Sequence, residues 1–410
     1  MKKYLNSGFN LTLVLYAIVS PISTSALYIF SGMMVIFGIG LLMKKKAIEI
    51  NKITIILFIA FFAWGGFTTI FSGNYFFGDV FNNLWEYLPV ILLPIFFQAS
   101  DVKKEKIVIA LLISSSVICL FGIIQYFFPA VIYPLPRQLA RTVFGNRIFF
   151  GFFHNQNPAA SFFSMITIIA FSLLLFWNIG KKHKIALLIF FGLTLTAVIL
   201  TISRNAFISI FTIFIIILFF KNRRWFVCGI TIFVVFLIII LSFSNPVSSR
   251  LKTLTDNKSH NNSARIEMWK IAIELFRDHP VAGIGKRNWE KVLTERKNNP
   301  QKWTFSSVID VLGHPHNIYL QLLAETGIIG LLLFIAFWGN IVQLLYLKNI
   351  QMSKGSFESA FIKGVLGVLG NLFLSNMFDS FLDSLWILLL LSFLVGIALG
   401  GSNSRIKEIR

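Results

Sequence analysis

Gly313-His314-Pro315-His316-Asn317 ends the longest polar segment of this 410-residue chain, which begins near Ser244 and runs directly into an apolar stretch. Sequence apolar enough for a hydrocarbon core borders the segment on both sides, so its polar residues must lie in water. It carries four of the six histidines and the arginines Arg250, Arg265, Arg277, Arg287 and Arg296. The sequence therefore combines apolar helices with one large polar loop in which a site can assemble.

The composition indicates a membrane protein. Hydrophobic residues make up 56% of the chain and charged residues only 13%, whereas soluble domains use roughly 45 to 50% apolar residues. The first apolar run, after Met1-Lys2-Lys3, is followed at once by a second, which favours a membrane span over a cleavable signal peptide. The net charge of +20 lies in short clusters between apolar runs, which argues against nucleic-acid binding.

The apolar runs predict an all-α polytopic membrane protein. About 20 apolar residues cross a hydrocarbon core of roughly 30 Å. By this measure we expect about twelve transmembrane helices, at residues 9–24, 26–43, 53–72, 84–99, 107–128, 157–178, 185–202, 205–220, 225–243, 327–347, 361–378 and 384–400. Only residues 21–25 separate the first pair, so eleven spans is the alternative.

The spans and the polar segment divide the chain into three parts. We expect an N-terminal transmembrane bundle at residues 1–243 and a large loop with short helices at 244–317. Residues 318–410 would form about three further spans and a cytoplasmic tail.

Basic residues predict the orientation, because short cytoplasmic loops hold Lys and Arg. With both termini cytoplasmic, every basic cluster falls inside: residues 44–46, 103–106, 181–184, 221–224, 348–354 and 405–410. The alternate short connections, 73–83 and 379–383, contain no basic residue. We therefore expect these connections, together with segments 129–156 and 244–317, on the external side.

Arg204 is an exception to this rule. It lies at the tip of an external connection between two spans, within Ser203-Arg-Asn205. An arginine there either reaches the lipid headgroups or offers a planar guanidinium that binds phosphate oxygens in pairs. Both interpretations stay open.

Residues 263–278 predict an amphipathic helix, with Ser263 as its N-cap and His279-Pro280 as its stop. Arg265 falls in the first turn, where the helix dipole disfavours a cation but the free N–H groups attract anions. This unfavourable position favours a functional role for Arg265. The predicted apolar face consists of Ile266, Trp269, Ile273 and Phe276.

Gly283-Ile-Gly285 follows this helix and precedes Lys286 and Arg287. Two glycines permit a tight turn whose N–H groups could surround an anion beside the basic pair. An ordinary turn is the simpler interpretation of a lone Gly-x-Gly.

The histidine motif at residues 314–317 is the sharpest local signal. Histidine titrates near neutral pH and can take a proton from an attacking hydroxyl, while Asn317 could orient the imidazole or a sugar. The alternative is a turn before a helix, with Asn317 as the cap.

The metal-ligand patterns are weak. Two histidines around a proline supply fewer ligands than a zinc site needs, and the sequence adds neither an Asp-x-Asp nor a His-Glu-x-x-His motif. Cys119 and Cys228 lie inside apolar runs, so no disulfide framework or cysteine metal site is expected. We expect a site without metal or cofactor, in which arginines stabilise negative charge.

The other external segment adds weaker candidates for phosphate or sugar contacts: Arg141, Arg147, His154 and Asn155. Asn157 before Pro158 is typical of a helix start, with the cap and the first helical residue in place.

Several of these motifs occur in a fixed order along the chain. His316-Asn317, the nine residues 318–326 and Gly327-x-x-Gly330 resemble the C-terminal signature of the O-antigen ligase family. Residues 151–160, 203–205, 265–269 and 280–285 resemble other motifs of that family, in the same order. The resemblance covers roughly residues 140–340, and the first 130 residues share only the hydropathy pattern.

The resemblance implies a GT-C-type glycosyltransferase of the Gram-negative inner membrane. Such ligases transfer a glycan en bloc from undecaprenyl pyrophosphate to a hydroxyl of lipid A-core oligosaccharide, at the periplasmic face and without metal. By motif position, His316 corresponds to the essential histidine of the family, and Arg204, Arg265 and Arg287 correspond to the family's arginines. Substrate contacts are expected from Asn317, His314, Lys286, Arg141, Arg147, His154 and Asn155, and Lys286 could fill the place of Arg287.

Three alternatives stay open. An O-antigen polymerase or a protein O-oligosaccharyltransferase would use the same donor with another acceptor. A lipid-linked oligosaccharide flippase is the rival from another class, but transporters need ionisable groups at membrane depth. Apart from Glu86 and Lys363 near span ends, the predicted spans hold no charged residue.

Overall fold

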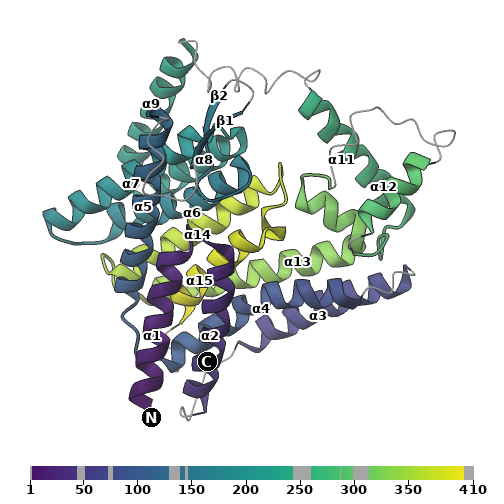
Figure 1. Ribbon diagram of the computed structural model, residues 1–410, viewed down its shortest axis with the longest axis horizontal. Helices are drawn as coiled ribbons and strands as arrows, with labels where there is room; N and C mark the ends of the chain where they lie inside the picture. The colour runs from purple at the N-terminus through teal and green to yellow at the C-terminus, as the bar shows by residue number, and fades with distance from the viewer. Residues whose placement is uncertain are drawn as a thin grey trace.

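A computed structural model describes residues 2–43, 51–72, 77–128, 139–143, 146–242, 260–286, 288–298 and 314–400. These residues are almost entirely helical (Figure 1). The N-terminal helices are α1 (Lys2–Val19), α2 (Thr24–Leu42), α3 (Lys52–Phe71), α4 (Phe77–Ala99), α5 (Lys104–Phe127), α6 (Gln156–Phe176), α7 (Lys181–Leu200), α8 (Arg204–Lys221) and α9 (Arg223–Ser242). The later ones are α11 (His260–Asp278), α12 (Trp289–Asn298), α13 (Ile318–Gln351), α14 (Phe357–Ser375) and α15 (Leu385–Leu399), with a 3₁₀ turn at Phe381–Asp383. Strands β1 (Ala140–Val143) and β2 (Asn146–Phe149) form an antiparallel hairpin.

Each predicted span falls on one of these helices. Eight described helices are long and apolar enough to cross a membrane: α2, α3, α5, α6, α7, α8, α13 and α14. Two shorter apolar helices, Leu84–Ala99 within α4 and α15, accompany them. The chain is an all-α polytopic membrane protein.

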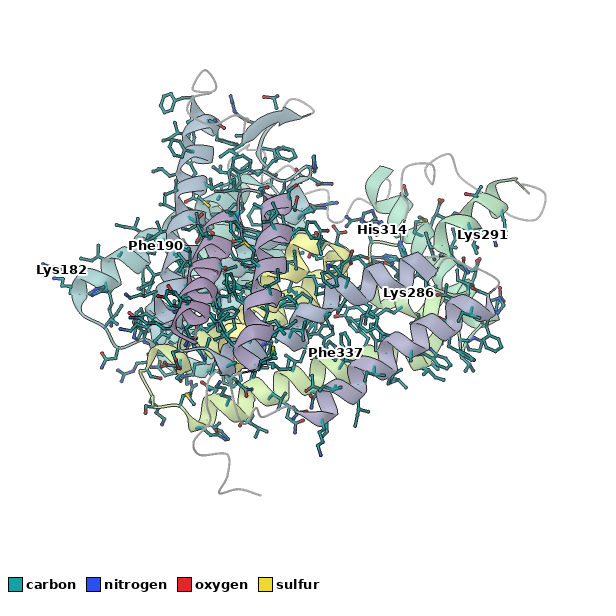
Figure 2. All side chains as sticks on the ribbon, turned by 60° about the horizontal axis from the view of Figure 1, so that its bottom comes forward. Lys182, Phe190, Lys286, Lys291, His314 and Phe337 are labelled. Atoms are coloured by element: carbon teal, nitrogen blue, oxygen red, sulfur yellow. The ribbon has the colours of Figure 1, made fainter. Side chains whose placement is uncertain are left out.

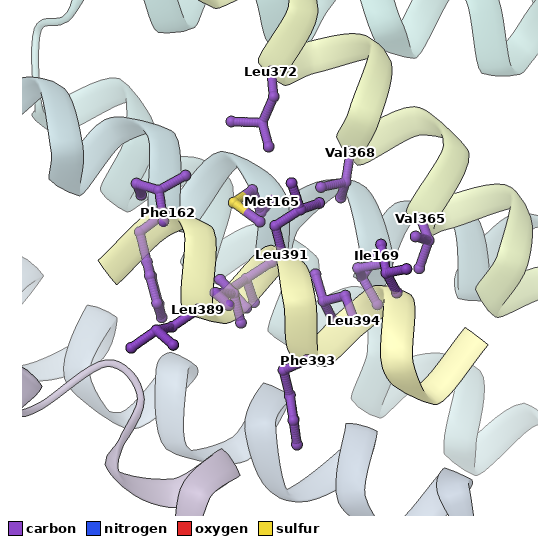
Figure 3. Close-up of a cluster of buried hydrophobic side chains, with 14 of the residues drawn as sticks. Phe162, Met165, Ile169, Val365, Val368, Leu372, Leu389, Leu391, Phe393 and Leu394 are labelled. Carbon is purple, nitrogen blue, oxygen red and sulfur yellow. The ribbon is translucent and has the colours of Figure 1, made fainter. Parts of the chain in front are cut away.

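The centre of the bundle is formed by α6, α14 and α15. Every residue of α15 from Trp386 to Ala398 is buried, as expected for a helix that is apolar on all sides. Met165 of α6, Val368 of α14 and Leu391 of α15 belong to one buried cluster (Figure 3). The N-terminal end of α6, which reaches the candidate site, therefore rests on a closely packed core.

The span predicted to begin at residue 327 is the second half of a longer, broken helix. Within α13, Gly327 has φ 66° and ψ −169°, so the residues before it form a separate helical segment. This conformation is open almost only to glycine. Residues 318–326 therefore form a short helix of their own before the span.

The Gly283–Gly285 turn packs against this break. The N–H groups of Ile284 and Gly285 donate to the carbonyls of Ala324 and Glu325, each at 2.9 Å, and Ile328 N–H donates to Pro280 O at 2.9 Å. Because these amides bind backbone carbonyls, the turn is structural and is not an anion-binding nest.

The predicted amphipathic helix is present as α11, but the prediction of its buried face was wrong. The buried residues are Ala264, Met268, Ile271, Ala272 and Leu275, whereas Ile273 is exposed. Met268, Ala272 and Leu275 pack with Ala324 of α13 and with Trp289 of α12. Met and Ala on α11 are buried because helix α13, distant in sequence, supplies the partner surface.

The conformation at Gly327 generates a stability prediction. We expect Gly327→Ala to destabilise the protein by at least about 1 to 3 kcal/mol, because a side chain is strained at this φ and ψ. A Cβ atom there would also overlap the carbonyl of Val281. Thermal unfolding of the purified protein measures the effect.

Gly339→Ala in the same helix is the control. A Cβ atom at Gly339 meets nothing within 4 Å, so this change should stabilise by about 0.5 to 1 kcal/mol. Equal melting temperatures for the two variants would contradict the role of Gly327.

Candidate active site

The turn at residues 314–317 is fixed to two helices. Trp269 of α11 donates its indole N–H to Pro315 O at 2.9 Å. Asn317 is the N-cap of α13, where its Oδ1 accepts from the N–H groups of Tyr319 and Leu320. Its Nδ2 donates to Met377 O at 3.0 Å. The cap interpretation of Asn317 is therefore confirmed.

His316 forms a hydrogen-bonded pair with Asp379. His316 Nδ1 lies 3.0 Å from Asp379 Oδ1, and the two side chains are only 18% and 12% exposed. The Ser380 N–H donates to the same carboxylate oxygen at 3.0 Å. An ionised carboxylate only accepts hydrogen bonds, so Nδ1 carries a proton, and in the neutral imidazole Nε2 is the proton acceptor.

The surroundings keep Asp379 ionised. Burial alone would raise the pKa of Asp379, but the hydrogen bond from His316, the charges of His316 and Arg265, and the Ser380 N–H lower it below its ordinary value. The His316 imidazole thus stays oriented by a negative charge at neutral pH.

Arg265 lies beside this pair. Burial lowers the pKa of Arg265, and the negative charge of Asp379 partly offsets that effect. The predicted role of Arg265 in the first turn of a helix thus coincides with a position next to a buried carboxylate. Here a guanidinium can stabilise negative charge that develops during a reaction.

His314 packs against His316, with ring centroids 4.1 Å apart. Burial, followed by the charge of His316, lowers the pKa of His314 to about 4; Asp379 acts in the opposite direction and Arg265 in the same one. His314 is therefore neutral at pH 7.

Arg204 is the first residue of α8. The neighbouring Asn205 donates its Nδ2 to Ser375 O at 2.8 Å, at the end of α14. The chain segment that carries Asp379 begins just beyond Ser375. Arg204 thus lies at the same end of the bundle as the His316–Asp379 pair.

The structure describes the side chains of two further candidates, Lys286 and Arg147. Lys286 lines a cavity of about 100 Å³ with Gln321 and Glu325, and its Nζ lies 5.4 Å from the ring centre of Phe61. Figure 2 shows Lys286 and His314 on the same side of the molecule, far from Lys182. Arg147 lies on β2 with its Nε buried. Arg287, Arg250 and the side chains of Arg141 and Arg296 lie outside the described residues.

The predicted helix start at Asn157 is off by two residues. The N-cap of α6 is Asn155, whose side chain accepts from the Asn157 N–H at 3.1 Å. Asn155 is exposed and caps the helix, and His154 beside it is exposed as well. Asn157 lies inside the first turn.

One group of described residues is close enough to hold a metal ion: His314, His316 and Asp379, whose ligand atoms lie within 4.8 Å of one another. However, the His316–Asp379 contact is a direct hydrogen bond, and the positive charge of Arg265 acts on both His314 and Asp379. A neighbouring cation disfavours a metal ion here.

The family model described as O-antigen ligase matches residues 187–335, from α7 into α13. This match supports the resemblance to the O-antigen ligase family that the sequence motifs indicate. None of the curated proteins matches the chain. The matched segment contains Arg204, Arg265 and His316 but not Asp379.

Asp379 is the candidate site residue that the sequence motifs did not indicate. Its short connection was noted only for lacking basic residues. The available signal was an acidic residue on the predicted external side, in a chain with only 17 acidic residues. Pairing it with His316 required the contact between α13 and α14.

The pKa of His314 generates a pH prediction. Its folded pKa of about 4 lies below the roughly 6.5 of an unfolded histidine. Stability from His314 is therefore complete above pH of about 6.5 and is lost as the pH falls toward 4. The pKa of Asp379 is lowered, so the stability that Asp379 contributes is lost only as the pH falls below about 5 and is still present at pH 5 to 7.

We expect the wild type to melt at a lower temperature at about pH 5 than at pH 7, and His314→Gln to reduce that difference. Thermal unfolding at the two pH values measures it. His279→Gln, at an exposed histidine after α11, is the control. The same pH difference in wild type and His314→Gln would contradict the prediction.

Proposed function

We propose that this protein is an O-antigen ligase, which transfers a glycan en bloc from undecaprenyl pyrophosphate to a hydroxyl of lipid A-core oligosaccharide. The observation that carries the proposal is the partly buried His316–Asp379 pair beside Arg265. It joins a proton acceptor to a cation at one place, as the displacement of a diphosphate by a hydroxyl requires.

The reaction we propose is a single displacement with inversion. His316 Nε2 takes the proton of the acceptor hydroxyl as its oxygen forms a bond to the anomeric carbon. The bond from that carbon to the diphosphate oxygen breaks, and the diphosphate leaves with the electron pair. Asp379 holds the imidazole and stabilises the imidazolium that forms.

Arg265 and Arg204 would neutralise the charge of the leaving diphosphate. Arg204 opens α8, and the N-terminal ends of α6 and α13 lie at the same end of the bundle. Helix N-termini carry partial positive charge and attract phosphate groups. The geometry therefore favours an anionic leaving group. It supports arginines in the role that a metal ion has elsewhere.

The site belongs to the external side in this proposal. Lysines gather at the other end: Lys348 donates to Leu399 O and Gly400 O at 2.9 and 2.8 Å, and Lys221 donates to Leu175 O at 2.7 Å. The positive-inside rule then makes that end cytoplasmic. We accordingly propose a GT-C-type enzyme of the inner membrane, with a periplasmic site.

The catalytic proposal predicts the effects of four substitutions. His316→Ala and Asp379→Asn should lower the transfer rate by on the order of 10² to 10⁴. Arg265→Ala and Arg204→Ala should each lower it by about 10² to 10³. The assay combines purified protein in detergent with an undecaprenyl-pyrophosphate glycan and lipid A-core acceptor.

Two matched controls share the residue types but lie away from the pair. His279→Ala and Arg277→Ala change exposed residues at the end of α11 and should keep the wild-type rate. A normal rate in His316→Ala would remove this histidine from the mechanism. Product formed only with a second lipid-linked glycan, or only with a protein acceptor, would identify a polymerase or a protein glycosyltransferase instead.

A chelator tests the role of metal ions. We expect EDTA to leave the transfer rate unchanged, because arginines supply the positive charge. A loss of activity that Zn²⁺ or Mg²⁺ restores would contradict the metal-independent mechanism and point to His314, His316 and Asp379 as ligands.

A further inference from the structure

The side-chain amide of Asn157 links Asp379 to a third helix. Its Nδ2 donates to Asp379 Oδ2 at 3.2 Å, and its Oδ1 accepts from Ser203 Oγ at 3.1 Å. A carboxylate only accepts hydrogen bonds, so the amide has a single orientation. Asn157 belongs to the first turn of α6, Ser203 precedes α8, and Asp379 follows α14. One amide thus holds together three helix ends that lie far apart in the sequence.

With Asn157, both oxygens of the Asp379 carboxylate are held. Oδ1 accepts from His316 Nδ1 and from the Ser380 N–H, while Oδ2 accepts from Asn157. Hydrogen bonds on one oxygen alone would leave the carboxylate free to rotate about its Cβ–Cγ bond. The bond from Asn157 fixes the plane of the carboxylate and thereby the direction of the His316 ring.

The Ser203 hydroxyl binds Asn157 and does not cap α8. Ser203 occupies the N-cap position of α8, but its side chain makes no capping hydrogen bond. A serine cap ordinarily stabilises a helix by about 1 kcal/mol. Its hydroxyl donates to Asn157 instead. Departures from a local stability rule are expected at functional sites.

Backbone strain marks both ends of the same network. Among the described residues, Ile202 and His316 are the two non-glycine residues with positive φ, at 54° and 50°. Such a conformation is rare, above all for a β-branched residue like isoleucine. Ile202 directly precedes Ser203, and His316 is the proposed base. The surrounding structure thus maintains a strained backbone where the network begins and where it ends.

We infer that Asn157 is a positioning residue for the His316–Asp379 pair and that Ser203 holds Asn157 in place. The inference rests on the proposed function of that pair. Because Arg204 follows Ser203 directly, the network also ties the start of α8 to the base. Base and arginine are then aligned by one chain of hydrogen bonds.

The first test removes the amide. Asn157→Ala should lower the transfer rate by on the order of 10², because a small misplacement of a catalytic group costs about that much. Ser203→Ala should lower it by about tenfold, since it loses a single hydrogen bond. The rates are measured with the undecaprenyl-pyrophosphate glycan and lipid A-core acceptor in detergent.

Two controls test for unspecific damage. Asn340→Ala removes an interhelical amide that accepts from Thr54, remote in sequence from the site, and Ser209→Ala removes a hydroxyl bonded within α8. Both should keep the wild-type rate. A wild-type rate in Asn157→Ala overturns the inference.

The second test replaces the amide by a titratable group. In Asn157→Asp, a protonated carboxyl group donates to Asp379 as the amide does, whereas two ionised carboxylates repel each other. His316, His314 and Arg265 also face Asp379. We expect activity near pH 5 that disappears as the pH rises, and no such recovery in Asn157→Ala. A structural role alone predicts the same pH profile in both variants and in wild type.

A third measurement does not depend on transfer. The melting temperature of Asn157→Asp, relative to wild type, should fall as the pH rises from about 5 to 8, because the two carboxylates then ionise together. Equal pH dependence in the two proteins overturns the contact. A wild type that transfers nothing to any acceptor would contradict the proposed function, and this measurement would still decide whether Asn157 holds Asp379.

Discussion

A buried carboxylate needs hydrogen-bond donors, and this requirement organises the site. Asp379 receives donors from residues 157, 316 and 380, which come from three separate parts of the chain. Without such donors a buried charge is costly, and the group would take up a proton instead. The ends of α6, α13 and α14 must therefore meet. The apolar core of α6, α14 and α15 fixes where they do so.

The two ends of the bundle differ in their electrostatics. At the site, the N-terminal ends of α6, α8 and α13 meet near Arg265, which creates a positive potential. At the other end, Lys348 donates hydrogen bonds to the carbonyls of Leu399 and Gly400 at the C-terminus of α15, and Lys104 also donates to Gly400. Cations near helix C-termini are stabilising. The same residues thus stabilise the bundle and, in our proposal, set its orientation in the membrane.

The sequence predicted the helices well because long apolar runs have one stable solution in a membrane. It could not predict which face of α11 is buried, since Met268 and Ala272 are buried only because α13 covers them. Nor did it predict the break at Gly327, where φ depends on the turn that packs against it. For the site, local motifs indicated His316 and Arg265, which the structure places beside Asp379 and which we propose as catalytic. The sequence did not indicate Asp379, and it indicated Asn157 only as a helix start, because the hydrogen bonds of both side chains join segments that are distant in sequence.

The spacing of the family signature has a structural meaning in this fold. Between the cap Asn317 and the break at Gly327 lie nine residues that form one short helix, with a length of about 13.5 Å at 1.5 Å per residue. Helix α11 packs along it through Met268, Ala272 and Leu275. At one end Trp269 binds Pro315, and at the other the turn after α11 binds the carbonyls of Ala324 and Glu325.

The length of this short helix therefore determines where α11 is anchored, and so how far Arg265 reaches toward the His316–Asp379 pair. An added or deleted residue between Asn317 and Gly327 would rotate the helix by about 100° and separate the two anchors. Gly327 of the signature thus acts on the proposed chemistry through the placement of Arg265.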